Sequence, residues 1–253
     1  MRDLNNMSIL ITGGGSGIGE GAADYFVARG ARVTICGRRH EKVDAVANRL
    51  GDACLAIQAD ITKAEDRENL MAAAVAHGDG LHALVNNAGN MYRGPIADLK
   101  EQDLLDIFHT NVVGGMLLTG LAEDHLARDG GAVIFLGSIH TRRAFPGASP
   151  YAATKGAVEA LTKVLAAELG HRNIRVNCIV PGAVLTEINQ RAGLYDDAAA
   201  AERLNAMASS HVLGRIGTEA EIAEAMDYLI RAEWTTGAVL EVDGGLGLGL
   251  TDA

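Results

Sequence analysis

The chain has little cysteine and little positive charge, and it lacks any long apolar run. Its 253 residues include 3 cysteines, Cys36, Cys54 and Cys178, which lie far apart in the sequence. An odd, unclustered set provides neither a disulfide framework nor the spacing of a zinc site, so we expect reduced, buried thiols. No apolar stretch reaches the roughly 18 residues that a membrane-spanning helix needs. The polar segment 1–6 leads directly into an apolar run, without room for a signal peptide. We therefore expect a cytoplasmic protein.

The charge balance restricts the partners of this protein. It has 22 Lys and Arg against 32 Asp and Glu, which gives a net charge of −10. Nonspecific binding to nucleic acid requires clustered basic residues, so a nucleic-acid partner is not expected. The 48% of apolar residues exclude disorder and collagen-like sequence. Glycine is in excess: the 31 glycines are about 12% of the chain, whereas roughly 7% is usual.

Short apolar segments alternate with longer amphipathic segments along the chain. The short segments are four to seven residues long, rich in Val and Ile, and apolar on both faces, which is typical of parallel strands covered by helices. The pattern predicts strands over 8–12, 32–36, 53–59, 82–85, 132–137, 175–180 and 239–242, and helices over 17–29, 40–50, 63–77, 101–128, 151–170 and 219–231. This alternation predicts a doubly wound α/β fold. Without linkers or repeats, residues 1–253 are expected to form one domain.

A glycine-rich segment, TGGGSGIG at residues 12–19, follows the first predicted strand and opens the first predicted helix. Glycine permits a tight turn there and lets the backbone approach a pyrophosphate, whose charge then lies at the helix N-terminus. The spacing Gly-x-x-x-Gly-x-Gly differs from the commonest fingerprint, Gly-x-Gly-x-x-Gly, and a simple tight turn is the alternative. The position between strand and helix favours a dinucleotide site.

The end of the second predicted strand bears on the choice of cofactor. Dinucleotide folds place an acidic residue there to bind the ribose 2′-hydroxyl of NAD, or an arginine to accommodate the 2′-phosphate of NADP. This chain has no Asp or Glu at that point, and Arg38 and Arg39 follow the strand. We expect both arginines to bind a 2′-phosphate, so NADP(H) is the expected cofactor and NAD(H) the alternative. The arginines could also simply form a solvated start to the next helix.

A tyrosine and a lysine lie four residues apart near the start of the fifth predicted helix. The spacing places Tyr151 and Lys155 on one helical face. A neighbouring ammonium group favours the phenolate, which makes a tyrosine a usable acid–base catalyst near neutral pH. Ser138 closes the fifth strand and could hold a reacting oxygen, although a capping role is an equal alternative. Asn111, an amide among apolar neighbours in a predicted helix, needs a specific hydrogen-bond partner and could be structural.

Together, these motifs resemble the short-chain dehydrogenase/reductase family in its compact single-domain form, from about residue 8 to residue 245. The resemblance implies a Rossmann-type, seven-stranded parallel sheet in the order 3-2-1-4-5-6-7, a nicotinamide cofactor, no catalytic metal, and a homotetramer or homodimer. Tyr151 would be the acid–base, Lys155 would hold the nicotinamide ribose, Ser138 would orient the substrate oxygen, and Asn111 would support a proton relay. The resemblance assigns further cofactor contacts to Gly13, Gly15, Ser16, Gly17, Ile18, Gly19, Asp60, Ile61, Asn87, Ala88, Gly89, Pro181, Gly182, Val184 and Thr186.

The substrate is expected over the carboxyl ends of the strands. The main candidates for substrate contacts are Met91, His140, Phe145 and Leu194. Leu194 belongs to segment 187–212, which we expect to form a lid that excludes water, unless its apolar residues only pack against the body. Apolar walls favour a neutral ketone or secondary alcohol. Arg142 and Arg143 leave an anionic substrate open, although two consecutive side chains usually cannot face one pocket.

Two other functions are compatible with the sequence. The chain is similar to 3-oxoacyl-carrier-protein reductases, and Arg128 and Arg172 could form a docking site for the acidic carrier. Asp129 beside Arg128 and the net charge of −10 argue against that partner. A non-catalytic dinucleotide sensor is an alternative from a different class, although the presence of Ser138, Tyr151 and Lys155 favours an enzyme.

Overall fold

The computed structural model describes residues 1–186, 202 and 206–249. These residues form a seven-stranded sheet in the order β3-β2-β1-β4-β5-β6-β7, and every neighbouring pair is parallel. The fold class and the strand order expected from the sequence are therefore confirmed. The strands are β1 (Ser8–Thr12), β2 (Arg32–Gly37), β3 (Cys54–Gln58), β4 (Ala83–Asn86), β5 (Ala132–Leu136), β6 (Arg175–Pro181) and β7 (Val239–Val242). Each predicted strand lies within one residue of the observed bounds.

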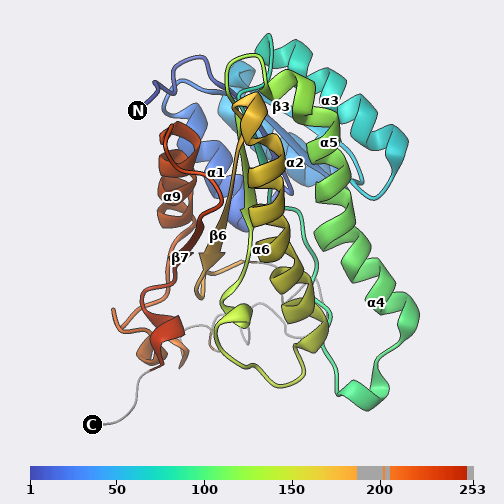
Figure 1. The fold of residues 1–253 in the computed structure, drawn as a ribbon, viewed down its shortest axis with the longest axis vertical. Coiled ribbons are helices and arrows are strands. Elements are labelled where there is room, and N and C mark those ends of the chain that lie inside the picture. The colour runs from blue at the N-terminus through green and yellow to red at the C-terminus, as the bar shows by residue number, and fades with distance from the viewer. Residues whose placement is uncertain (187–201, 203–205, 250–253) are drawn as a thin grey trace.

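Helices cover both faces of the sheet (Figure 1). They are α1 (Gly17–Val27), α2 (His40–Leu50), α3 (Ala64–Gly78), α4 (Glu101–Phe108), α5 (Gly114–Leu126), α6 (Ser149–Leu169) and α9 (Glu219–Arg231). α1, α2 and α9 lie on one face, and α3, α4, α5 and α6 lie on the other. Successive strand residues point to opposite faces, so Ile9 and Ile11 pack with Phe26 of α1, while Leu10 packs with Leu118 of α5. This alternation explains why the strands are apolar on both sides.

The helix expected over 101–128 differs from the prediction because a π-helical turn, His109–Val113, separates α4 from α5. The helical segment Glu101–Leu126 is 26 residues long with a mean hydropathy of 1.3, so it is long and apolar enough to cross a membrane by those criteria alone. The sequence analysis did not identify it because polar residues such as His109, Thr110 and Asn111 interrupt its apolar positions. Core helices of α/β proteins meet the same criteria, and Leu118, Ala122 and Leu126 of its inner face are fully buried.

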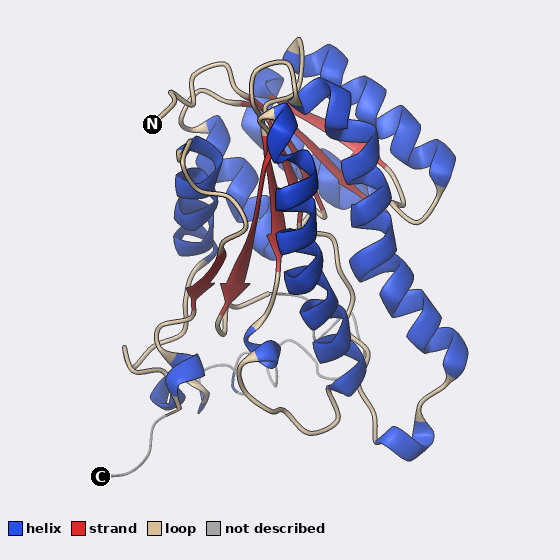
Figure 2. Ribbon diagram, viewed as in Figure 1, coloured by secondary structure: helices blue, strands red, loops and turns tan. Residues whose placement is uncertain are grey.

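Because all strands are parallel, their carboxyl ends meet at one edge of the sheet, which is the lower edge in Figure 2. The loops that follow β1, β4, β5 and β6 therefore gather at that edge, where ligands bind in open α/β sheets. The three cysteines are free and buried in the core, as expected. Burial raises the pKa of Cys36 and of Cys178 to about 12, so both thiols stay protonated and unreactive at neutral pH.

Candidate active site

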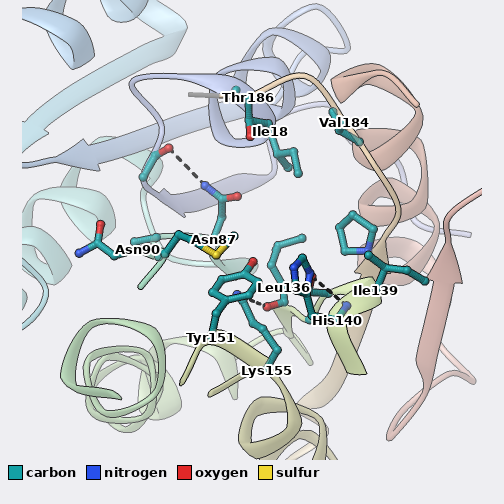
Figure 3. Close-up of a pocket in the computed structure, with 18 of the residues that line it drawn as sticks. Ile18, Asn87, Asn90, Leu136, Ile139, His140, Tyr151, Lys155, Val184 and Thr186 are labelled. Carbon is teal, nitrogen blue, oxygen red and sulfur yellow. Dashed lines mark hydrogen bonds between the residues drawn. The ribbon is translucent and has the colours of Figure 1, made fainter. Parts of the chain in front are cut away.

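A cavity of about 590 Å³ opens at the carboxyl edge of the sheet. It brings together most of the residues singled out in the sequence, from segments far apart in the chain (Figure 3). The predicted residues that line it are Gly13, Ser16, Gly17, Ile18, Arg38, Asp60, Ile61, Met91, Asn87, Ala88, Gly89, Ser138, His140, Phe145, Tyr151, Lys155, Pro181, Gly182, Val184 and Thr186. Gly15 and Arg39 line an adjoining cavity of about 530 Å³.

Two of the predicted site residues that the structure describes, Gly19 and Asn111, do not line either cavity. Gly19 lies behind the glycine loop, and a Cβ atom at this position would lie 2.3 Å from the carbonyl oxygen of Gly13. Asn111 lies behind the cavity wall and acts on it through hydrogen bonds. Leu194, like most of the expected lid at 187–212, is outside the described residues; Met207, near the end of that segment, lines the cavity.

The glycine loop has the geometry of a phosphate-binding turn. Gly13 and Gly17 have φ values of 69° and 56°, a region that favours glycine. Asn87 secures the loop, because its Nδ2 donates to the carbonyl oxygens of Thr12 at 2.8 Å and of Gly13 at 3.2 Å. Ser16, the N-cap of α1, makes no side-chain capping bond, so it does not occupy the first-turn amides. These features fit a dinucleotide whose pyrophosphate lies at the N-terminus of α1.

The far end of the cavity combines one carboxylate with an arginine. Burial favours the neutral form of Asp60, but two hydrogen bonds from Thr62 and the positive charges of Arg38 and Lys63 outweigh it and lower the pKa of Asp60 below its ordinary value. Asp60 is therefore ionised and fixed as a hydrogen-bond acceptor. Arg38 Nη2 lies 3.5 Å from Asn90 Oδ1, and Arg39 Nη2 lies 3.3 Å from Ser16 Oγ. Both arginines thus border the space beyond the glycine loop.

The predicted acid–base pair lies on the first two turns of α6. Tyr151 and Lys155 are buried, at 7% and 5% exposure. Lys155 Nζ lies 5.5 Å from the centroid of the Tyr151 ring and donates to the carbonyl oxygen of Leu136 at the end of β5, at 2.7 Å. In Figure 3 both side chains project into the cavity, opposite Ile18 and Thr186. The arrangement places an ammonium group beside a phenol in a site shielded from water, as acid–base use of the phenol requires.

Ser138 and His140 form a second pair across the cavity from the glycine loop. The Ser138 Oγ and His140 Nδ1 atoms are 3.1 Å apart. The His140 ring packs against Phe145, at 4.4 Å between ring centroids, and edge-on against Tyr151, at 5.1 Å. Burial lowers the pKa of His140 to about 4, and the positive charges of Arg93 and Lys155 act in the same direction. His140 is therefore neutral near pH 7 and positions the Ser138 hydroxyl.

Asn111 lies in the π-helical turn between α4 and α5, a type of local structure that is frequent at functional sites. Its Oδ1 accepts the N–H of Asn90 at 2.7 Å. Its Nδ2 donates to the Asn90 carbonyl at 2.9 Å and to Thr154 Oγ1 at 3.1 Å. The side chain thus ties the loop after β4 to α6, which carries Tyr151 and Lys155. The specific partner that a buried amide requires is present.

The sequence analysis did not identify some of the site residues. Arg93 lines the cavity, and its position four residues after the Asn-Asn-Ala-Gly segment could have identified it. His211 is 2% exposed; its Nε2 accepts from the Ala183 amide at 3.4 Å and its Nδ1 donates to the Met207 carbonyl at 2.9 Å. It connects the turn after β6 to residues 207–211, and a lone histidine gives no sequence signal for that role. In the described part of the chain, no group of three His, Cys, Asp or Glu side chains could hold a metal ion.

The fold and the cavity define an α/β oxidoreductase with a dinucleotide site, and comparison with known proteins identifies the family. The family model described as Enoyl-(Acyl carrier protein) reductase matches residues 13–247. The solved structure of 3-ketoacyl-(acyl-carrier-protein) reductase from Brucella melitensis complexed with NADH superposes with a TM-score of 0.89 at 32% identity, over 96% of this chain and 99% of that chain. The protein belongs to the short-chain dehydrogenase/reductase family of oxidoreductases, which bind a nicotinamide cofactor.

The relatives of this chain differ in what they act on. It is 33% identical to carbonyl reductase family member 4 of Danio rerio, over 94% of this chain and 97% of that protein. It is 38% identical to L-fucose dehydrogenase of Oryctolagus cuniculus, over 95% of this chain and 85% of that protein. It is 36% identical to glucose 1-dehydrogenase of Gluconobacter oxydans, over 95% of this chain and 91% of that protein. Family membership therefore leaves the substrate open.

Proposed function

We propose that the protein transfers hydride between NADP(H) and a ketone or secondary alcohol, with Tyr151 as the acid–base. The observation that carries this proposal is the convergence of Ser138, Tyr151 and Lys155 in one cavity with the glycine loop of β1. The nicotinamide ring supplies or accepts the hydride when the cofactor is bound. Ser138 orients the substrate oxygen, and Tyr151 exchanges a proton with it. Lys155, whose ammonium group lies 5.5 Å from the centroid of the Tyr151 ring, holds the nicotinamide ribose when the cofactor is bound.

Tyr151→Phe tests the acid–base role because it removes the hydroxyl and keeps the ring. We expect kcat to fall about 100-fold or more, while NADPH binding, followed by fluorescence titration, stays within about twofold, since van der Waals packing is retained. Tyr25→Phe is the matched control, because Tyr25 on α1 lines neither cavity and loses only a hydroxyl that bonds to Asp227. Wild-type activity in Tyr151→Phe would refute the assignment. If the wild type binds NADPH tightly but turns over no member of a broad panel of ketones and alcohols, the alternative function, a non-catalytic dinucleotide sensor, would be favoured.

The preference for NADP(H) rests on the end of β2. Arg38 lines both cavities, and Arg39 and Lys42 line the second one, next to Gly15 of the glycine loop. A guanidinium group at this position suits a 2′-phosphate. Arg38→Asp should shift the ratio of catalytic efficiencies towards NAD, whereas Arg32→Asp, at the opposite end of the same strand, should leave it unchanged. Equal efficiencies of the wild type with both cofactors, together with no shift in Arg38→Asp, would exclude the preference.

Reduction of 3-oxoacyl groups on a carrier protein is the second candidate, because relatives such as the mouse protein, at 31% identity, are named 3-oxoacyl-[acyl-carrier-protein] reductase. The docking residues expected for an acidic carrier argue against it. Arg172 is paired with Glu123 at 2.7 Å and with Asp124 at 2.8 Å, so its charge is largely neutralised. Comparing a 3-oxoacyl group on the carrier with the same group on a small thiol tests this alternative. A strong preference for the carrier would favour it.

We also propose a homotetramer. The outer face of α4, the π-helical turn and α5 exposes a stripe of apolar side chains: Leu105, Val113, Met116, Leu117 and Leu121. A second exposed apolar group, Tyr228 with the fully exposed Trp234, lies at the end of α9 and in the following loop. Two separate apolar surfaces suit an assembly with two kinds of interface. Sedimentation equilibrium of the wild type measures the assembly directly; a monomer at micromolar concentration would exclude it.

A further inference from the structure

The substrate end of the cavity carries two arginines that have no carboxylate partner in the part of the chain that the structure describes. Arg93 lies in the loop after β4, and Arg143 lies in the loop after β5; both are half-buried and line the cavity. Among the described residues, neither forms an ion pair. The one hydrogen bond given by Arg93 goes to the carbonyl oxygen of Pro146, at 3.2 Å. A half-buried cation next to a ligand cavity without an acidic partner retains most of its charge for a ligand.

The neighbouring arginine shows the contrast. Arg142 does not line the cavity: its Nη1 pairs with Glu159 at 2.8 Å and its Nε with Glu241. The sequence expectation that two consecutive side chains cannot face one pocket is therefore met, and Arg143 is the one that faces it. Arg142 already has two acidic partners, whereas Arg143 has none among the residues that the structure describes. The difference leaves the guanidinium group of Arg143 available on the cavity wall.

The two loops that carry Arg93 and Arg143 are held together by hydrogen bonds. The Gly94 amide donates to the Gly147 carbonyl at 2.9 Å, which adds to the bond from Arg93 to Pro146. The positive charge of Arg93 also lowers the pKa of His140, whose ring packs on Tyr151, so Arg93 lies close enough to act on that ring. Arg93 thus belongs to the substrate end, while Arg38 lies at the other end near Asp60.

The charge of the cavity is opposite to that of the whole protein. Of its described lining residues, four are cationic (Arg38, Arg93, Arg143 and Lys155) and one is anionic (Asp60), although the chain carries a net charge of −10. The cofactor accounts for Arg38 and Lys155 under the proposed function, but it does not account for the two arginines at the substrate end. A cleft of one sign of charge concentrates ligands of the opposite sign. Met91, Phe145 and Met207 supply apolar walls between these charges.

We propose that the substrate is a ketone or secondary alcohol that also carries an anionic group, a carboxylate or a phosphate, which Arg143 and Arg93 bind. This inference rests on the proposed function, and it replaces the expectation of a neutral substrate. The anionic group lies beside these two arginines, and the reacting carbon lies at Tyr151. An apolar spacer between the two groups contacts Met91, Phe145 and Met207.

Matched substrates test the proposal. The probes are straight-chain keto acids of increasing length with the ketone on the carbon next to the terminal methyl group, their methyl esters, and ketones of the same lengths that end in a phosphate group, each assayed with NADPH and with NADH. For the wild type we expect kcat/KM at least about tenfold higher for an anionic substrate than for its neutral ester, mainly through KM, because a charge-assisted pair is worth about one such factor. The carboxylate and phosphate series distinguish the two anionic groups.

Variants then assign the effect to the arginines. Arg143→Gln should abolish the preference for the anionic substrate and leave kcat/KM for the ester within about twofold. Arg93→Gln, which also loses the bond to Pro146, should lower turnover of both substrates and of the anionic one more strongly. Arg128→Gln is the matched control, since it removes the same charge on an exposed site near the amino end of β5. It should not change the preference.

The outcomes separate this proposal from the proposed function. Turnover of the ester with an unchanged ratio in the double variant Arg93→Gln, Arg143→Gln overturns the anionic substrate and leaves the oxidoreductase activity intact. If no ketone is reduced with either cofactor, the proposed oxidoreductase activity is wrong. Calorimetric titration of the keto acids and their esters into the protein with NADP⁺ then tests whether the arginines bind an anionic group. Tighter binding of the acid than of the ester, lost in Arg143→Gln, supports the arginine site; equal binding overturns it.

Discussion

Replacing Asn111 by Asp tests whether this side chain holds the loop after β4 in place. The substitution preserves shape and keeps the Oδ1 acceptor for the Asn90 amide. It converts the Nδ2 donor into a carboxylate oxygen that faces the Asn90 carbonyl and Thr154 Oγ1, which are 2.9 and 3.1 Å from Nδ2 in the wild type. Two hydrogen bonds are lost, and one of them is replaced by the repulsion of two oxygen atoms.

The size of the effect follows from burial. Asn111 is 7% exposed, so bulk water cannot replace the lost partners. Each buried group left without its partner costs about 1–3 kcal/mol, so we expect the free energy of unfolding to fall by roughly 2–6 kcal/mol. Because Asn111 joins the loop after β4 to α6, we also expect the catalytic groups to shift. A displacement of about 1 Å lowers kcat/KM roughly 100-fold.

Asn177→Asp provides the matched control. Asn177 is fully buried, its Nδ2 donates to the Thr235 carbonyl at 3.0 Å, and its Oδ1 accepts from the Ala238 amide at 3.0 Å. The chemistry of the substitution is the same, but this side chain joins β6 to the segment before β7 and does not line the cavity. We expect a loss of about 1–3 kcal/mol in stability and no change in kcat/KM for the folded enzyme.

The assay combines urea unfolding, followed by circular dichroism, with steady-state kinetics well below the unfolding transition. A destabilised Asn111→Asp variant with wild-type kcat/KM would refute the positioning role. An equal loss of kcat/KM in Asn177→Asp would show that general destabilisation, not the position of the loop after β4, causes the fall in activity.

Two further predictions concern a helix end and a buried histidine. Arg175, 8% exposed, donates three hydrogen bonds of 2.6–2.9 Å to carbonyl groups at the end of α9. Arg175→Met should lower the free energy of unfolding by about 3 kcal/mol in urea titrations. Arg172→Met, which removes surface ion pairs with Glu123 and Asp124, should cost much less; similar losses would contradict this. The pKa of His140 is about 4 in the folded protein against an ordinary value of 6.5. The unfolded chain therefore binds the proton more readily between these values, and stability falls as pH decreases through that window. His140→Gln should lose this part of the slope between about pH 6.5 and about pH 4; equal slopes would exclude it.

Much of the site was predictable because its residues follow strand ends. Glycines at 13–19, Asn87 and Ser138 each come directly after a strand, and parallel strands bring their carboxyl ends to one edge. Tyr151 and Lys155 were predictable from helical spacing. Arg93 could have been found from its place after the Asn-Asn-Ala-Gly segment, but His211 could not, because its role depends on a contact with a turn that is distant in the sequence. The π-helical turn was not predicted either, because the residue to which its Asn111 bonds, Asn90, lies 21 residues away in the sequence.

The sequence by itself determined the α/β fold and the candidate cofactor and acid–base residues, because periodicity, glycine placement and spacing are local properties of the chain. It also limited the arginine pair 142–143 to one cavity-facing member, without saying which. Only the tertiary structure decided that question: Glu159 on α6 and Glu241 on β7 lie beside Arg142 and not beside Arg143. Which cation is neutralised depends on carboxylates brought close by folding, and the charge of the substrate end follows from that contact.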